Sequence, residues 1–248
     1  MTGAAAGIGR AITEALVARG WRVGAYDVDE AGLATLTHPA VVPGRLDVRS
    51  EGDWYAALSA LTAHSGGRLD LLVNNAGILQ TGALATIPLA DQRRTVEVNV
   101  IGVLNGCHTA YPLLKATPGA HVVNLCSASA IYGQPELATY SATKFAVRGL
   151  TEALDLEWAE DDITVTAMWP LFVKSAMTTE MDTASSRQLG IRLTPQDVAD
   201  EVMKVVEAKG PLPHRVHRAV GRQAKAMLAA SSLGPSWLNR LVNQRISR

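Results

Sequence analysis

The sequence has few aromatic residues, only two cysteines and no long hydrophobic run, and each of these shortages excludes a class of protein. Aromatic side chains make up 5% of the 248 residues, too few for a binding module built on aromatic clusters. Cys107 and Cys126 cannot form a disulfide framework and suit a reducing compartment. No apolar run approaches the ~18 residues that span a bilayer, and the opening MTGAAAGIGR shows no secretory signal. We therefore expect a soluble, globular protein of the cytoplasm.

The sequence also lacks net charge, but its 23 basic and 23 acidic residues are unevenly distributed. Residues 1–207 hold 15 basic and 23 acidic side chains, whereas residues 208–248 hold eight basic and no acidic ones. Such a tail could bind nucleic acid or an anionic membrane surface. We favour the alternative that it packs on the same protein or on a neighbouring subunit. Because no nucleic-acid-binding motif accompanies the charge, we expect no nucleic-acid partner.

Short apolar runs alternate with longer helical patterns along the chain, without repeats or a linker. Continuous apolar strands separated by helices predict a parallel sheet covered on both faces, in a single α/β domain. The expected strands are residues 21–26, 41–46, 69–74, 120–126 and 163–169. The expected helices are residues 8–19, 51–64, 91–114, 138–158 and 194–208, with a short turn after Asp29.

A stretch of small residues, TGAAAGIG at Thr2–Gly9, leads directly into the first expected helix. Small side chains let backbone N–H groups approach a pyrophosphate, and the N-terminus of a helix adds positive potential. Taken alone, the stretch also fits simple close packing. Its weight comes from Asp27, which lies 20 residues after Gly7 at the end of the second expected strand. A carboxylate there accepts the ribose hydroxyls of NAD and repels the 2′-phosphate of NADP, so NAD is favoured.

Tyr140 and Lys144 are four residues apart, so on a helix they share one face. A tyrosine with its ordinary pKa of ~10 is a poor base at neutral pH. A neighbouring ammonium stabilises the phenolate, and a shift of ~3 units takes only ~4 kcal/mol. The pair suits proton exchange with an alcohol or carbonyl, and Ser127, at a strand end, is placed to bind the same oxygen.

Several simpler interpretations stay open at this point. Tyr140 and Lys144 alone could be a surface helix pair, and Ser129 competes with Ser127 as the relevant hydroxyl. Cys126 is more typical of a small buried hydrophobic residue than of a nucleophile. The six histidines show no metal-ligand spacing, so we expect no metal site.

Together these residues resemble the short-chain dehydrogenase/reductase family from Thr2 to about Ala208. The matching segments are TGAAAGIG at 2–9, LDV at 46–48, NNAG at 74–77, VNVIG around Asn99, Ser127 and YSATK at 140–144. The resemblance implies a single-domain Rossmann-type fold with a doubly wound parallel sheet in three layers. It also implies hydride transfer between a nicotinamide and a carbonyl or alcohol.

The resemblance further assigns roles to individual residues. Tyr140 would be the general acid/base, Lys144 would lower its pKa and bind the nicotinamide ribose, and Ser127 would orient the substrate oxygen. Asn99 would hold a water in a proton relay, although a purely structural role for Asn75 and Asn99 stays open. The residues implied to bind the cofactor are Gly3, Ala6, Gly7, Ile8, Gly9, Asp27, Asp47, Val48, Asn75, Ala76, Gly77, Tyr140, Lys144, Pro170, Val173 and Ser175.

The sequence departs from the family pattern at three places. Only Met1 precedes Thr2, where an apolar strand is usual, so we expect a truncated first strand and a natural start upstream of Met1 or an extension in its place. Leu171 follows Pro170 where glycine is usual, and Ser175 replaces a commoner threonine, so the loop over the nicotinamide is expected to differ. The C-terminal part, with an expected strand at 214–220 and helices at 223–230 and 237–246, resembles the retinol- and steroid-oxidising branch.

These observations predict an NAD-dependent enzyme that interconverts a lipophilic secondary alcohol and a ketone. Residues 1–210 would form the nucleotide-binding and catalytic domain, and residues 211–248 a basic amphipathic extension packed on it. The apolar face of that extension would be formed by Met227, Leu228, Leu233, Trp237, Leu238, Leu241 and Val242. The family resemblance implies a homodimer or homotetramer, with the helices at 91–114 and 138–158 at the interfaces. The alternative is a non-catalytic nucleotide sensor or a lipid-binding protein on the same fold.

Overall fold

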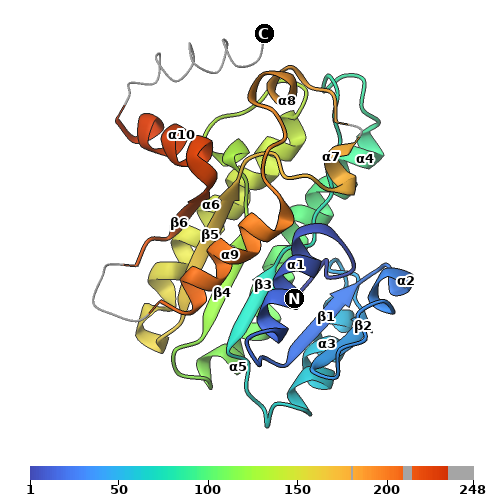
Figure 1. Ribbon diagram of the computed structural model, residues 1–248, viewed down its shortest axis with the longest axis vertical. Helices are drawn as coiled ribbons and strands as arrows, with labels where there is room; N and C mark the ends of the chain where they lie inside the picture. Colours follow the sequence, from blue (N-terminus) through green and yellow to red (C-terminus); the bar gives the residue numbers. More distant parts are fainter. Residues whose placement is uncertain (180, 209–213, 234–248) are drawn as a thin grey trace.

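The computed structural model describes residues 1–179, 181–208 and 214–233, and it places two parallel sheets between layers of helices (Figure 1). β1 (Val23–Asp27) and β2 (Val41–Arg45) form the smaller sheet. The larger sheet has the order β3 (Leu71–Asn74), β4 (His121–Leu125), β5 (Thr164–Pro170) and β6 (His217–Val220). All strand pairs are parallel, so the predicted parallel α/β fold is confirmed.

The first four residues take up only one end of the space between β1 and β3. Met1 N–H donates to the Gly24 carbonyl at 2.9 Å, and Thr2 N–H donates to the Val73 carbonyl at 3.2 Å, so this short stub touches both sheets. A cavity of about 400 Å³ continues along the rest of the space, lined by side chains that include Val23, Leu71 and Leu72. Burial lowers the pKa of the Met1 amino group to about 5. The expected full strand before the glycine-rich segment is therefore absent from the described residues, and the sheet is divided there.

One face of the sheets is covered by α1 (Gly7–Val17) and α9 (Pro195–Val206), which pack against each other. Ile12 of α1 and Val202 of α9 are fully buried with the strand side chains of this face. Thr194 and Asp197 form a capping box at the start of α9, and Pro195 is its first helical residue. The short α2 (Glu30–Leu33) follows β1 and is capped by Asp29.

The opposite face is covered by α3 (Glu51–Thr62), α5 (Gly102–Lys115) and α6 (Ala138–Glu157). The single helix expected at 91–114 is interrupted. It consists of α4 (Leu89–Val96), a π-helical turn η1 (Glu97–Ile101) and α5. The extra residue of a π-turn rotates the helix locally, and such turns often lie at functional sites. The turn contains Asn99, which explains how a helical residue can be turned toward the loop after β3.

The C-terminal part contains two short helices after β5 that the sequence pattern did not predict, α7 (Ala176–Thr179) and α8 (Ala184–Leu189). β6 lies within the strand expected at 214–220, and α10 (Gly221–Leu233), which follows it, includes the helix expected at 223–230. Short 3₁₀ turns η2 (Ala128–Ala130) and η3 (Ala159–Asp161) flank α6. Ala224 of α10 is buried against Leu171 and Phe172 after β5. The helix expected at 237–246 lies outside the described residues, as do the side chains of Leu233, Trp237, Leu238, Leu241 and Val242.

None of the helices in the described part of the chain combines the length and hydropathy needed to span a bilayer.

Candidate active site

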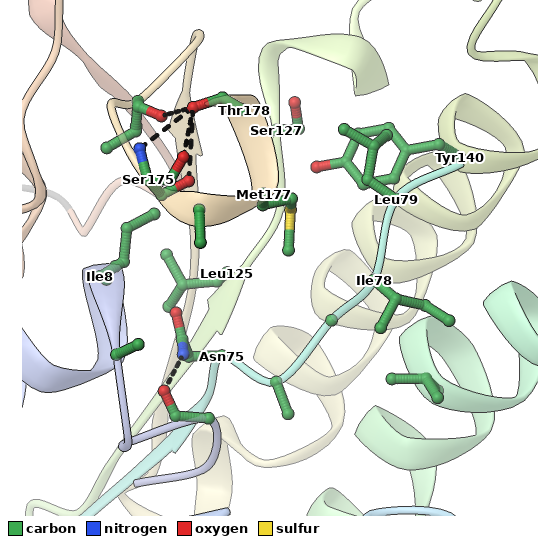
Figure 2. Close-up of a pocket in the computed structure, with 18 of the residues that line it drawn as sticks. Ile8, Asn75, Ile78, Leu79, Leu125, Ser127, Tyr140, Ser175, Met177 and Thr178 are labelled. Carbon is green, nitrogen blue, oxygen red and sulfur yellow. Dashed lines mark hydrogen bonds between the residues drawn. The ribbon is translucent and has the colours of Figure 1, made fainter. Parts of the chain in front are cut away.

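A cavity of about 410 Å³ opens at the carboxyl ends of the strands, where parallel α/β sheets usually bind their ligands (Figure 2). Every residue predicted to bind a cofactor lines it except Gly9, and so do three of the four predicted catalytic residues. Asn99 is the fourth and does not line it. The site therefore brings together segments from residue 3 to residue 181, with the glycine-rich segment at one side and Tyr140 at the other.

The glycine-rich segment forms a cradle that only glycine allows at two positions. Gly3 and Gly7 have φ angles of 66° and 55°, which other residues rarely adopt. A Cβ on Gly9 would lie 1.9 Å from the Gly3 carbonyl oxygen, so Gly9 permits close packing and does not face the cavity. No side chain caps the N-terminus of α1 at Ala6, which leaves the backbone N–H groups of its first turn for an anion. The cradle thus fits the pyrophosphate of a dinucleotide.

Asp27 lines the cavity at the end of β1, and the backbone holds its carboxylate in place. Oδ2 accepts the Ala5 N–H at 3.0 Å, and Oδ1 accepts the Asp29 N–H at 3.1 Å. Each oxygen keeps a further lone pair for another donor. This arrangement fits a ribose diol, and a phosphate beside the same carboxylate would be repelled.

Asp47 and Val48 line the cavity beside Asp27, with a partner that the sequence pattern did not identify. Arg49 donates from Nε and Nη2 to the two oxygens of Asp47, at 2.9 and 2.6 Å. These hydrogen bonds hold the pKa of the Asp47 carboxyl below its usual range. Arg94 of α4 also lines this part of the cavity and was missed, because no motif marks an arginine on the surface of a helix.

Asn75, Ala76 and Gly77 follow β3, and their contacts are largely structural. Asn75 Nδ2 donates to the carbonyls of Thr2 and Gly3, at 2.9 and 3.1 Å. Thr2 Oγ1 accepts the N–H groups of Asn75 and Ala76. These bonds attach the loop after β3 to the glycine-rich cradle, so the two walls of the cavity are connected.

Ser127 and Tyr140 face the same part of the cavity (Figure 2). Burial raises the pKa of Tyr140 to about 12, and a hydrogen bond with Ser127 partly offsets this increase. Ser127 Oγ also accepts the Ser129 N–H at 3.1 Å and lies 3.2 Å from Ser129 Oγ. Ser129 thus orients the Ser127 hydroxyl, and both serines line the cavity.

Lys144 lies on the face of α6 that carries Tyr140, but its contacts differ from the prediction. Its Nζ donates to the Leu125 carbonyl at 2.8 Å and lies 5.4 Å from the centre of the Tyr140 ring. Burial lowers the pKa of this ammonium. Its hydrogen bond goes to a backbone carbonyl, and the lowering of the Tyr140 pKa by Lys144 stays a prediction.

Asn99 has a full set of hydrogen bonds inside the protein. Its Oδ1 accepts the Ile78 N–H at 2.8 Å, and its Nδ2 donates to the Ile78 carbonyl at 2.9 Å and to Thr143 Oγ1 at 3.2 Å. The side chain joins the loop after β3 to α6, next to Lys144. Its contacts match the structural alternative considered for this residue.

The loop after β5, which contains Ser175, forms the wall of the cavity opposite the glycine-rich cradle. Leu171, in the position where glycine is usual, is not among the described non-glycine residues with positive φ. It therefore occupies the loop without backbone strain. Ser175 N–H donates to Thr178 Oγ1 at 3.1 Å, and both residues line the cavity with Pro170 and Val173. A Cβ on Gly7 would be 3.7 Å from the Ser175 side chain, so the cradle and this loop face each other.

The part of the cavity beyond Tyr140 is apolar, and its residues were largely missed by motif reading. Side chains of this kind come from four separate segments and are Ile78, Leu79, Leu137, Leu171, Phe172, Met177 and Met181. The two methionines have flexible side chains, which suit a pocket that adapts to its ligand. Cys126 also lines the cavity, but burial raises the pKa of its thiol to about 11, so it is no nucleophile at neutral pH.

Comparison with known proteins gives a consistent family. The family model described as short chain dehydrogenase matches residues 1–186. A short-chain type dehydrogenase/reductase of Sinorhizobium fredii is 37% identical over 189 residues, which are 74% of this chain and 34% of that protein. The 3-alpha-(or 20-beta)-hydroxysteroid dehydrogenase of Mycobacterium tuberculosis is 35% identical over 72% of this chain and 69% of its own length.

Solved structures agree with the sequence comparisons. The crystal structure of 3-ketoacyl-(acyl-carrier-protein) reductase from Brucella melitensis complexed with NADH superimposes with a TM-score of 0.80. It is 29% identical and covers 88% of this chain and 94% of its own. The matched family model, the relatives and the superposition lead to one conclusion. The chain belongs to the short-chain dehydrogenase/reductase family of oxidoreductases.

Proposed function

We propose that the protein is an NAD-dependent oxidoreductase that interconverts a secondary alcohol and a ketone. The observation that carries this proposal is the single cavity lined at one side by the cradle and Asp27 and at the other by Ser127 and Tyr140. The cradle and the loop at Ser175 would hold the nucleotide, and the space beside Tyr140 would then be left for a second molecule.

In the proposed reaction, a bound nicotinamide supplies a hydride to a carbonyl carbon or takes one from an alcohol carbon. The chain's own groups handle the oxygen. Ser127 Oγ binds the substrate oxygen, and Tyr140 donates its proton to that oxygen during reduction, since its raised pKa keeps the phenol protonated at neutral pH. In the oxidation direction Tyr140 accepts the proton, which requires its phenolate. Lys144, buried beneath the tyrosine, supplies the positive charge that favours this phenolate when the site is occupied.

NAD is the proposed cofactor because the arginine beside Asp47 is already paired and Asp27 carries a negative charge at the ribose end of the site. The Arg49 guanidinium is bonded to Asp47 and lies 3.6 Å from Glu97, so neighbouring carboxylates offset its charge. The Asp27 carboxylate disfavours a 2′-phosphate by repulsion. The Brucella relative binds NADH, which supports the same choice.

The proposed substrate is lipophilic. Leu79, Leu137, Phe172 and the two methionines give the space beyond Tyr140 an apolar wall, which favours a hydrophobic molecule bearing a single reactive oxygen. The relative from Mycobacterium tuberculosis is named for hydroxysteroids, which are molecules of this type. We also propose a homodimer or homotetramer, since Ile101 at the end of η1, Leu104 of α5 and Phe145 of α6 are exposed apolar side chains. Light scattering tests that assembly.

The first test is replacement of Tyr140. Tyr140→Phe removes the proton carrier and keeps the ring, so we expect turnover with NADH and a panel of ketones to fall at least about a hundredfold. Affinity for NADH, followed by nicotinamide fluorescence, should change less than about twofold. Tyr132→Phe is the matched control, because this half-buried tyrosine precedes α6 but does not line the cavity. Normal turnover in Tyr140→Phe would refute the mechanism.

A further inference from the structure

Residues 181–193, which include α8, contribute Met181 to the cavity and pack against the apolar cluster around it; we call them the lid segment. Its C-terminal end is attached beside β5, because Lys174 N–H donates to the Leu193 carbonyl at 2.8 Å and Val173 pairs with Leu193. At its other end, Met181 is buried against Leu137, Leu171 and Phe172. The lid segment is therefore one wall of the space next to Tyr140.

Glu136 binds the lid segment from the loop that precedes α6. Its Oε2 accepts the Ala184 N–H at 3.0 Å. Ala184 is the first residue of α8, so its N–H has no acceptor within the helix. The cap residue Thr183 bonds Ser186 instead, which leaves Glu136 as the acceptor for Ala184. One side-chain contact thus connects α8 to the chain four residues before Tyr140.

The backbone of Glu136 binds a second wall of the cavity, the loop that contains Leu79 and Gly82. Its carbonyl accepts the Gly82 N–H at 2.9 Å, in the loop that carries Leu79 into the cavity. Leu137, the next residue, is 1% exposed and also lines the cavity. Glu136 therefore connects three walls of the cavity: the loop that contains Leu79 and Gly82, which we call the Gly82 loop, the start of α6 and the lid segment.

Glu136 makes these contacts from an unfavourable backbone conformation. Its φ is 63°, and Asp162 is the only other non-glycine residue of the described chain with a positive φ. Glycine adopts this conformation without strain, but it has no carboxylate that could reach Ala184. Strain of this kind persists where the surroundings require a particular side chain, often near functional sites. Asp162, at φ 57°, follows η3 and does not line the cavity.

We propose that Glu136 is a positioning residue that fixes the lid segment and the Gly82 loop against the start of α6, so that the apolar pocket is closed around the substrate. The proposal rests on the proposed function insofar as the pocket holds a ketone or alcohol. The hydrogen bond between Glu136 and Ala184 is itself a contact between two parts of the chain, so it can be tested without a substrate.

The decisive variant is Glu136→Gly, which removes the carboxylate and suits the left-handed backbone. Asp162→Gly is its matched control, because it makes the same replacement in the same conformation away from the cavity. Glu136→Gln keeps a carbonyl oxygen that can accept the Ala184 N–H, so its effects should be smaller than those of Glu136→Gly.

Limited trypsin digestion gives a readout that needs no activity, since Arg187 and Arg192 lie in the lid segment. We expect cleavage at these two arginines to be about tenfold faster in Glu136→Gly, intermediate in Glu136→Gln and unchanged in Asp162→Gly. Cleavage of Glu136→Gly at the wild-type rate would overturn the proposal. Faster cleavage throughout the chain would also overturn it, because it indicates general unfolding.

Steady-state kinetics give the second readout. KM for a turned-over ketone should rise about tenfold in Glu136→Gly, while kcat and the Kd for NADH stay within about twofold. A fall in kcat with unchanged KM would overturn a positioning role. If the wild-type protein reduces none of the ketones, the proposed function fails, and the trypsin experiment still decides whether Glu136 holds the lid segment.

Discussion

At the scale of single residues, burial changes the pKa of Tyr140 in the direction opposite to the one that its motif predicts. Tyr140 and Lys144 have the spacing that predicts a lowered tyrosine pKa, yet burial raises that pKa to about 12. The ammonium donates to the Leu125 carbonyl, so its charge is partly satisfied away from the phenol. The spacing of Tyr140 and Lys144 along the helix determines that they share a face. It does not determine which acceptor the Lys144 ammonium binds.

The raised pKa of Tyr140 can be measured in the protein prepared without cofactor. Because the phenolate of buried Tyr140 is disfavoured, we expect no phenolate from this residue below about pH 11 in an ultraviolet absorbance titration. Wild type and Tyr140→Phe should therefore give the same tyrosinate signal up to about pH 10. A Tyr140-dependent signal near neutral pH would show that Lys144 lowers the pKa even in the empty site.

Asp27 makes a separate prediction about cofactor choice. Asp27→Ala removes both the acceptor for the ribose hydroxyls and the repulsion of a 2′-phosphate, so the ratio of NADPH to NADH dissociation constants should fall at least about tenfold. Fluorescence titration with each nucleotide measures this ratio. Asp29→Ala is the matched control, since Asp29 caps α2 and does not line the cavity. An unchanged ratio in Asp27→Ala would mean that this carboxylate does not contact the ribose.

At the scale of elements, the π-turn between α4 and α5 is the main departure from the predicted helices. It places Asn99 so that both polar atoms of its amide bond the backbone of Ile78, and the same side chain reaches Thr143 on α6. A regular helix over 91–114 was the simplest interpretation of the periodicity. Periodicity cannot show a single extra residue in one turn, because the apolar positions on either side still repeat with helical spacing.

Asn99→Ala distinguishes the structural role from a proton-relay role. The buried side chain is 1% exposed, and its loss leaves the N–H and carbonyl of Ile78 without partners. We expect a destabilisation of about 1–3 kcal/mol in thermal or urea unfolding. NADH affinity should fall as well, because the loop after β3 loses its attachment. Unchanged stability with a large loss of turnover would instead support a catalytic water at this residue.

At the scale of the whole molecule, the divided sheet is the most consequential feature. The stub at Met1–Ala4 touches both sheets, and the cavity of about 400 Å³ separates the rest of β1 from β3. The cradle at Thr2–Gly9 overlaps this stub, so its position depends on a few hydrogen bonds and not on a full strand. Joining the two sheets should therefore stabilise both the fold and the cofactor site.

An added strand tests this directly. A chain extended before Met1 by about five alternating Val and Ile residues can pair between β1 and β3. Burying three or four such side chains contributes about 1.5–3 kcal/mol each, so unfolding should require several kcal/mol more. A Gly/Ser extension of equal length is the matched control, because it adds no apolar side chains. Equal stability of the two extended chains would show that the cavity does not accept a strand.

The same pair of extensions isolates the buried amino group. The pKa of the Met1 amino group falls from 8.0 to about 5 on folding, so the unfolded chain binds a proton that the folded chain releases between these values. Stability of the unextended protein should therefore rise as pH increases from about 5 to about 8. The rise should be smaller with either extension, because Met1 then has a peptide N–H and the remaining dependence comes from groups such as His121 and His217, whose pKa values burial also lowers. Urea unfolding across this pH range measures the difference.

The sequence by itself determined the order of the strands and of the longer helices, the cradle at Thr2–Gly9, and most of the residues that line the nucleotide side of the cavity. These depend on local periodicity and on spacing within one segment, which a linear sequence contains. Tertiary structure alone decided the acceptor of Lys144, the hydrogen bonds of Asn99, the apolar wall and the contact between Glu136 and α8. Each of these joins segments that lie far apart in the chain, and burial sets their energies, so only the packed fold brings the partners together and excludes water from them.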